Sequence, residues 1–142
     1  MARFVIVSVL VLCIGCASGA ARFAGELPAS RLSEMKRFYV QHQPRDSRNI
    51  HLAIREELQA FGFEVDAGRG EPAGEYDAIV TYVDRYVWDM TMYCLQLTVY
   101  FHDTRTGYIT ATGWSRRPSL VRKTPKGHAR LILSELFGRD PG

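Results

Sequence analysis

The sequence has little of several features that would narrow its function. It holds only three cysteines in 142 residues, an odd number and too few for the disulfide framework of a small secreted protein. Its formal net charge of +3 is too small to indicate nucleic-acid binding by itself. No internal repeat is found. Hydrophobic residues make up 46% and charged residues 23% of the chain, a balance that predicts one ordinary globular domain.

Motifs for catalysis and metal binding are also lacking. The four histidines (His42, His51, His102 and His128) show no i, i+4 pair and no neighbouring cysteine, so we expect them at the surface or rim, with no metal site and no cofactor. The serines lack the G-x-S-x-G setting of a serine hydrolase. The sequence therefore predicts no catalytic residue, and we expect that the protein is not an enzyme.

The N-terminal segment is the clearest pattern present. Arg3 precedes an uncharged apolar run over residues 4–16, and small residues follow over 17–21, which is typical of a secretory signal. A helix of about 13 residues is about 20 Å long, shorter than the bilayer core of about 30 Å. The segment therefore predicts export rather than a permanent membrane span.

Two cleavage positions fit the signal. Small residues around Ala20 and Ala21 allow a cut after either of them. The other cut falls before Cys16, because Ile14-Gly15-Cys16 resembles the lipobox of bacterial lipoproteins, with Cys13 where leucine is usual.

The lipobox resemblance implies a lipid anchor. Cys16 would become the first residue and carry a diacylglycerol on its sulfur, with a further acyl group such as palmitate on its amine. Several acyl chains give stable anchoring, whereas one is marginal. Ala17 and Ser18 do not resemble the inner-membrane retention signal, so the resemblance implies the outer membrane, facing the periplasm. The alternative is a soluble secreted or periplasmic protein.

The whole chain divides into three parts by composition. Residues 1–15 are the predicted signal peptide, residues 16–35 are a lipidated N-terminus and tether rich in small residues, and residues 36–142 are a single domain. If the signal leaves and Cys16 is acylated, Cys94 is the only free thiol. We expect it to be buried, because a free thiol is a liability in an oxidising compartment, and no histidine or asparagine spacing supports a catalytic cysteine.

Hydrophobic periodicity predicts an α+β domain. Apolar residues at helical spacing, such as Ile50, Ile54 and Leu58, predict a helix over residues 48–61 that ends at Gly62. A second helix is expected over residues 128–137, and strands over residues 37–42, 63–66, 76–86, 89–103 and 108–114. We expect a two-layer sandwich, with a mainly antiparallel sheet of four to five strands and two helices on one face.

A resemblance covers most of the mature chain. From Phe38 to Gly138, the stretches FYVQHQPRDSRNIHLAIREELQAFGFEVDAG and YDAIVTYVDRYVWDMTMYCLQLTVYFHDTRTG and the ending LSELFG resemble a family of small bacterial outer-membrane lipoproteins of unknown activity. More distantly, the layout is similar to periplasmic domains of lipoproteins that activate peptidoglycan synthases and of curli-type secretion lipoproteins. The resemblance implies location and fold, and no catalytic residues.

A basic segment near the C-terminus is a candidate binding surface. Six cations fall within 15 positions without an acid among them: Arg116, Arg117, Arg122, Lys123, Lys126 and Arg130. They form either a solvated loop or a site for an anionic partner, such as lipid phosphates, lipopolysaccharide, peptidoglycan carboxylates or an acidic protein surface.

Two functional hypotheses follow, and the oligomeric state stays open. The first is a lipid-anchored interaction or scaffold module of the cell envelope, which uses the basic segment or a sheet face with Gln96, Thr98 and Tyr100. The second is an envelope enzyme or small-ligand binder at the corner formed by Asp84, Trp88 and Asp89, where paired carboxylates could perform acid–base chemistry.

Overall fold

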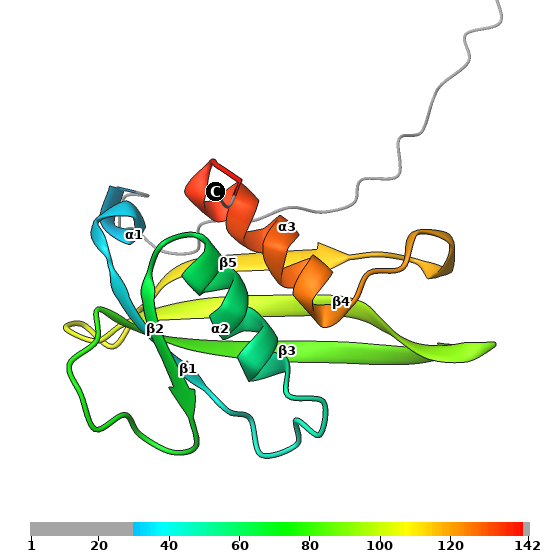
Figure 1. Ribbon diagram of the computed structural model, residues 1–142, viewed down its shortest axis with the longest axis horizontal. Coiled ribbons are helices and arrows are strands. Elements are labelled where there is room, and N and C mark those ends of the chain that lie inside the picture. The colour runs from blue at the N-terminus through cyan, green and yellow to red at the C-terminus, as the bar shows by residue number, and fades with distance from the viewer. Residues whose placement is uncertain (1–29, 141–142) are drawn as a thin grey trace, which may run out of the picture.

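The computed structural model describes residues 30–140. The predicted signal, the two cleavage positions and Cys16 lie outside these residues. The elements, in chain order, are α1 (Ser30–Glu34), β1 (Arg37–Gln41), α2 (Ile50–Ala60), β2 (Glu64–Gly68), β3 (Ala78–Asp89), β4 (Thr91–Asp103), β5 (Ile109–Arg116), the 3₁₀ turn η1 (Ser119–Val121) and α3 (Pro125–Phe137) (Figure 1).

The five strands form one mixed sheet in the order β2-β1-β3-β4-β5. β1 is parallel to both of its neighbours, whereas β3 and β4, and β4 and β5, are antiparallel. The expectation of a mainly antiparallel sheet is therefore wrong. The reason is that α2 carries the chain back to the end where β1 began, so β2 runs parallel to β1. The nine-residue loop over residues 69–77 then returns the chain for β3.

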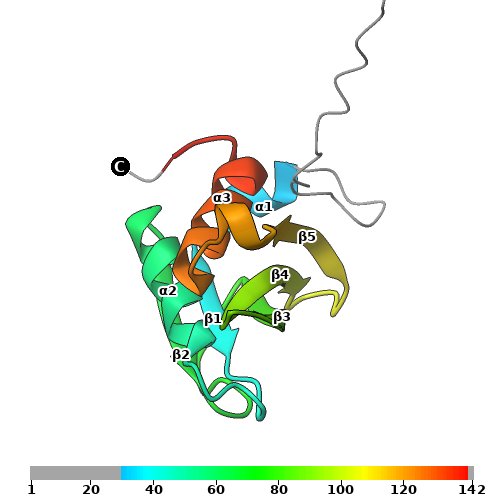
Figure 2. The ribbon, with the colours of Figure 1, turned by 90° about the vertical axis from the view of Figure 1, so that its right-hand side faces the viewer.

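The helices α2 and α3 cover one face of the sheet (Figure 2). Between them and the strands lies one hydrophobic core, with Phe38, Phe101 and Leu133 among its fully buried side chains. The core also includes Leu32 and Met35, so the folded body begins within the predicted tether. None of the helices in the described part of the chain is long and apolar enough to cross a bilayer.

Helix α3 begins three residues before its predicted start. Pro125 occupies the first turn, where its missing N–H removes no helical hydrogen bond, and the Thr124 side chain caps the helix by accepting from the Gly127 N–H. The helix packs closely on β5 at Gly113, where an added Cβ would lie 2.4 Å from Cγ2 of Ile132. Glycine at this position thus sets the approach of α3 to the sheet.

A β-bulge reverses the faces of one end of β4. Leu97 pairs with Asp84 and Gln96 with Arg85, but Tyr86 pairs with Cys94, so Leu95 is the extra residue. Leu97, Val99 and Phe101 point toward the helices and are buried. Beyond the bulge the alternation shifts by one residue. Cys94 is buried, as expected, and the bulge places it on the face of the sheet that its partner Tyr86 occupies.

Candidate functional site

The corner formed by Asp84, Trp88 and Asp89 does not bring its two carboxylates together. β3 alternates regularly through this region, so Asp84 and Asp89, five positions apart, point to opposite faces of the sheet and are separated by roughly 17 Å of strand. Asp84 pairs with the buried Leu97, whereas Asp89 stands at the hairpin end beside Thr91. This geometry does not provide the convergent carboxylates that the second hypothesis requires.

The same hairpin end gathers several of the large exposed apolar side chains of the described residues. We define the apolar tip as Trp88, Met90, Met92, Leu120 and Val121, whose exposed fractions are 72%, 86%, 51%, 98% and 51%. The first three come from the β3–β4 turn and the last two from η1. The hairpin and the loop after β5 project at the same end of the molecule in Figure 1. Exposed apolar groups of this size mark interaction sites.

Arg122 holds the two halves of the apolar tip together. Its Nη2 donates to the Asp89 carbonyl at 2.8 Å and its Nη1 to Oγ1 of Thr91 at 2.6 Å. The guanidinium also stacks over the Tyr93 ring, 4.6 Å from its centroid. Arg122 therefore fixes η1 against the β3–β4 hairpin, which is a structural role for one of the six predicted cations.

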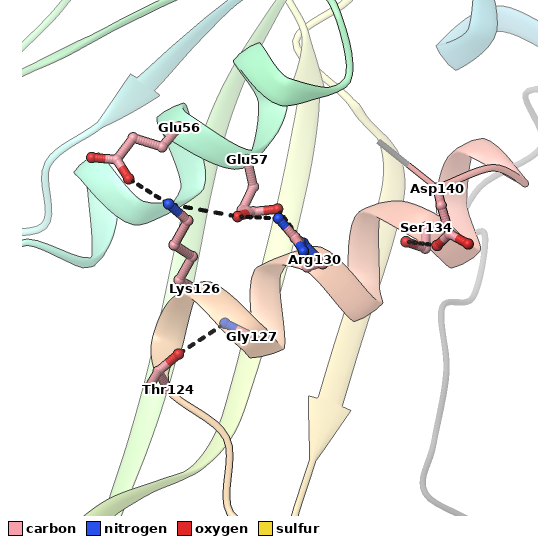
Figure 3. A network of polar contacts seen from close by, with 8 residues as sticks. All are labelled: Glu56, Glu57, Thr124, Lys126, Gly127, Arg130, Ser134 and Asp140. Carbon is pink, nitrogen blue, oxygen red and sulfur yellow. Dashed lines mark hydrogen bonds and ion pairs between the residues drawn. The ribbon is translucent and has the colours of Figure 1, made fainter. Parts of the chain in front are cut away.

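Two more of the six cations are neutralised by acids on α2. Lys126 Nζ lies 2.9 Å from Oε2 of Glu56, and Arg130 Nε lies 2.9 Å from Oε2 of Glu57, whose side chain is buried (Figure 3). These ion pairs join α2 to α3. The sequence could not indicate them, because the acids are about 70 positions away in the chain.

The remaining cations are available for an anionic partner. Arg116 and Lys123 are exposed and Arg117 is half-buried, and within residues 30–140 none of these three forms an ion pair. Arg116 ends β5 and Lys123 follows η1, so these cations flank the apolar tip. The candidate surface for an anionic partner thus has three cations in place of the six that the sequence indicated, and it lies next to the apolar tip.

The structure brings together two histidines that the sequence left apart. The rings of His42 and His51 meet edge to face with centroids 4.4 Å apart, and His51 Nδ1 lies 3.3 Å from Oδ2 of Asp46. His42, Asp46 and His51 each offer a ligand atom, and these atoms all lie within 4.8 Å of one another. The expectation of scattered surface histidines is wrong here, because the loop between β1 and α2 folds residue 42 over residue 51.

Asp46 organises this cluster as a buried acceptor. Its Oδ2 accepts from the Tyr82 hydroxyl at 2.6 Å and from the backbone N–H of His51 at 3.3 Å. Its Oδ1 accepts from the backbone N–H of Arg48 at 2.8 Å. Burial by itself would raise the pKa of Asp46, but these hydrogen bonds outweigh it and hold the pKa below its ordinary value. Burial lowers the pKa of His51, which favours the neutral imidazole.

His128 and Cys94 form a second buried polar contact, and it is structural. His128 Nε2 donates to the Cys94 carbonyl at 3.0 Å, so its Nδ1 accepts from the Ser115 hydroxyl at 3.0 Å. His128 is fully buried, so the expected surface position is wrong for this residue too. Burial raises the pKa of the Cys94 thiol to about 11, which keeps it protonated and unreactive at neutral pH.

Comparisons with known proteins show the fold. No protein-family model and no curated protein matches the sequence. Among solved structures, the chain is similar to a dodecamer of a leucine-to-methionine variant of PelC from Paraburkholderia phytofirmans, with 13% identity and a TM-score of 0.57 over 85% of this chain and 97% of that one. A second PelC dodecamer from the same organism matches with 15% identity and a TM-score of 0.54, over 86% and 99%.

Proposed function

We propose that the protein is a lipid-anchored cell-envelope module that holds its apolar tip in the surface of an anionic membrane and presents its open sheet face to other proteins. The observation that carries the proposal is the apolar tip itself. Trp88, Met90 and Leu120 are mostly exposed, although a monomeric protein in water gains nothing by exposing them together. Tryptophan in particular favours the boundary between lipid and water.

The charges around the tip fit the same partner. Arg116 and Lys123 are exposed and unpaired within the described part of the chain, and each cation near an anionic bilayer contributes about 1 kcal/mol of attraction. Five apolar side chains beside a few cations give weak, reversible membrane contact. That contact orients a protein whose stable attachment comes from the lipid predicted on Cys16.

The dimensions allow both contacts at once. Arg31 of α1 lies 3.4 Å from Asp103, at the end of β4 far from the tip. β4 has 13 residues and is therefore about 44 Å long. A chain between Cys16 and Ser30 can span at most about 50 Å, which is enough for an anchor at one end and the tip at the other to reach the same bilayer.

The scaffold part of the proposal rests on the sheet face opposite the helices. Gln96, Thr98 and Tyr100 of β4 are half-buried there and Val83 of β3 is 59% exposed, because no described element covers this face. The PelC neighbours are dodecamers, so a second copy of the chain is one partner that this fold accommodates in a similar protein.

Brominated-lipid quenching of Trp88 tests the membrane contact. The full lipidated chain, with Trp114→Phe so that Trp88 is the sole tryptophan, is placed in phosphatidylglycerol-containing vesicles. We expect bromines in the upper acyl chain to quench Trp88 strongly, and Leu120→Ser with Met90→Ser to reduce the quenching. The matched controls are Val83→Ser, which should leave the quenching unchanged, and a Trp88→Phe chain, in which Trp114 should be quenched little.

The outcomes separate the two parts of the proposal. Equal quenching of Trp88 and Trp114, or none, would contradict membrane contact by the apolar tip. Chemical crosslinking in the same vesicles should give multimers that Val83→Asp reduces. Only monomers at every protein density would contradict the scaffold part.

A further inference from the structure

The cluster of His42, Asp46 and His51 lies where β1 leads into α2. His42 follows β1, Asp46 lies in the loop, and His51 is the second residue of α2. Asp46 and His51 are buried and His42 is half-buried. A buried carboxylate beside two imidazoles is a costly arrangement in a small domain, and it needs a reason.

The distances among the three side chains suit the coordination of a metal ion. Zinc binds imidazole nitrogen and carboxylate oxygen at about 2.0–2.2 Å, so ligand atoms around a tetrahedral zinc lie about 3.3–3.6 Å apart. His51 Nδ1 and Asp46 Oδ2 are already 3.3 Å apart, and all three ligand atoms lie within 4.8 Å. The half-buried His42 ring can close the remaining gap, since the hydrogen bond between its Nε2 and the Asp46 carbonyl is 3.2 Å long.

The groups around the ligands form an outer shell. The Tyr82 hydroxyl, itself an acceptor for the Gln43 N–H, donates to Asp46 Oδ2 at 2.6 Å, and the Arg48 N–H donates to Oδ1. Such hydrogen bonds orient a ligating carboxylate. A carboxylate has about four lone-pair sites, so Asp46 can exchange its 3.3 Å contact with His51 Nδ1 for a metal bond and keep the other donors.

We propose that His42, Asp46 and His51 bind a divalent transition-metal ion of the Zn²⁺ class, with water as the fourth ligand. Two imidazoles and one carboxylate suit Zn²⁺. Soft metal ions such as Cu⁺ prefer thiolate ligands, and this set of three ligands contains none. The bound ion would join the end of β1 to the start of α2. The site is independent of the proposed function, so failure of either leaves the other standing.

Calorimetric titration of the full chain in detergent with zinc chloride tests the site. We expect one Zn²⁺ per chain, and Tyr82→Phe should weaken binding by about 10–100-fold, the usual cost of losing an outer-shell partner. His42→Ala removes a ligand and should weaken binding at least as much. His102→Ala is the matched control, because His102 is half-buried and forms a hydrogen bond with Thr81 on the open sheet face. This variant should bind Zn²⁺ as tightly as the unaltered chain does.

Cobalt substitution gives a second readout that needs no variant. Co²⁺ in the unaltered chain should show the intense visible absorption of four-coordinate cobalt, and Zn²⁺ should abolish it. No binding by the unaltered chain, or binding by His42→Ala as tight as that of the unaltered chain, would overturn the proposal. The weak spectrum of fully hydrated cobalt would overturn it as well.

Discussion

Replacing Phe38 with alanine is expected to lower the free energy of unfolding by about 3–5 kcal/mol, the usual cost of deleting a buried aromatic side chain. Phe38 is fully buried on β1. Its ring lies 5.0 Å from that of Phe63 and 5.6 Å from that of Phe101, both edge to face, and 6.5 Å from that of Phe137. It therefore joins β1, the residue that precedes β2, β4 and α3 in one aromatic cluster.

Urea unfolding followed by circular dichroism measures this cost. A domain of this size has about 5–15 kcal/mol of total stability, so Phe38→Ala should lose a large share of it and unfold at a much lower urea concentration. Phe38→Leu should retain much of the lost stability because it leaves a smaller cavity. Tyr108→Ala, at an exposed position, should stay within about 0.5 kcal/mol of the unaltered chain. A loss below about 1 kcal/mol for Phe38→Ala would contradict the central place of this ring.

Asp46→Ala should cost about 3 kcal/mol at neutral pH without metal, the top of the range for hydrogen bonds to a charged acceptor. One carboxylate satisfies the Tyr82 hydroxyl and the N–H groups of Arg48 and His51, and its loss leaves buried donors unpaired. EDTA in the buffer separates this effect from metal binding. Asp66→Ala is the control, because Asp66 accepts from Tyr76 at the surface and its loss should matter little.

The cost of losing Asp46 should depend on pH in one direction. The pKa of Asp46 is lower in the folded chain than its ordinary value of 3.8, so the folded protein binds fewer protons than the unfolded protein near that pH. Its contribution is fully present above this value and is lost as the pH falls through the lower, folded pKa. The stability difference between the unaltered chain and Asp46→Ala should therefore shrink as the pH falls below 3.8. A difference that grows as the pH falls below that value would contradict this hydrogen-bond network.

The local elements could be predicted from the sequence, because local patterns determine them. The apolar spacing of Ile50, Ile54 and Leu58 predicts α2, and all three are buried. Gly62 follows the helix with a φ of 90°, the left-handed geometry that favours glycine at a helix end. Asp46 accepts from the backbone N–H of His51 in the first turn of α2, although Asn49 occupies the cap position itself.

The long-range features could not be predicted from these patterns. The parallel pairing of β1 with β3 joins segments 40 residues apart, and periodicity carries no information about which strands become neighbours. The bulge at Leu95 adds one residue without a glycine or proline to indicate it, and it reverses the face of Cys94. The strand pairing and the bulge both concern which residues become neighbours in the sheet, and not which helices and strands form.

For the candidate sites too, the sequence indicated local features but not the contacts between distant segments. The six-cation segment was visible in the sequence, but Glu56 and Glu57 neutralise Lys126 and Arg130 from another helix. The apolar tip combines a hairpin turn with η1, about 30 positions later, and only the fold places them together. His42 and His51 are nine positions apart, separated by a loop and the start of a helix, a spacing that matches no regular metal motif.

Intact-mass spectrometry of the protein purified from the membranes of a bacterium with an outer membrane tests the lipid anchor most directly. The proposed function predicts a mature chain that begins at Cys16 and carries a diacylglycerol and a further acyl group, and Cys16→Ala should abolish both the added mass and the membrane attachment. A mature chain that begins after Ala20 or Ala21, with no added lipid mass, would contradict it.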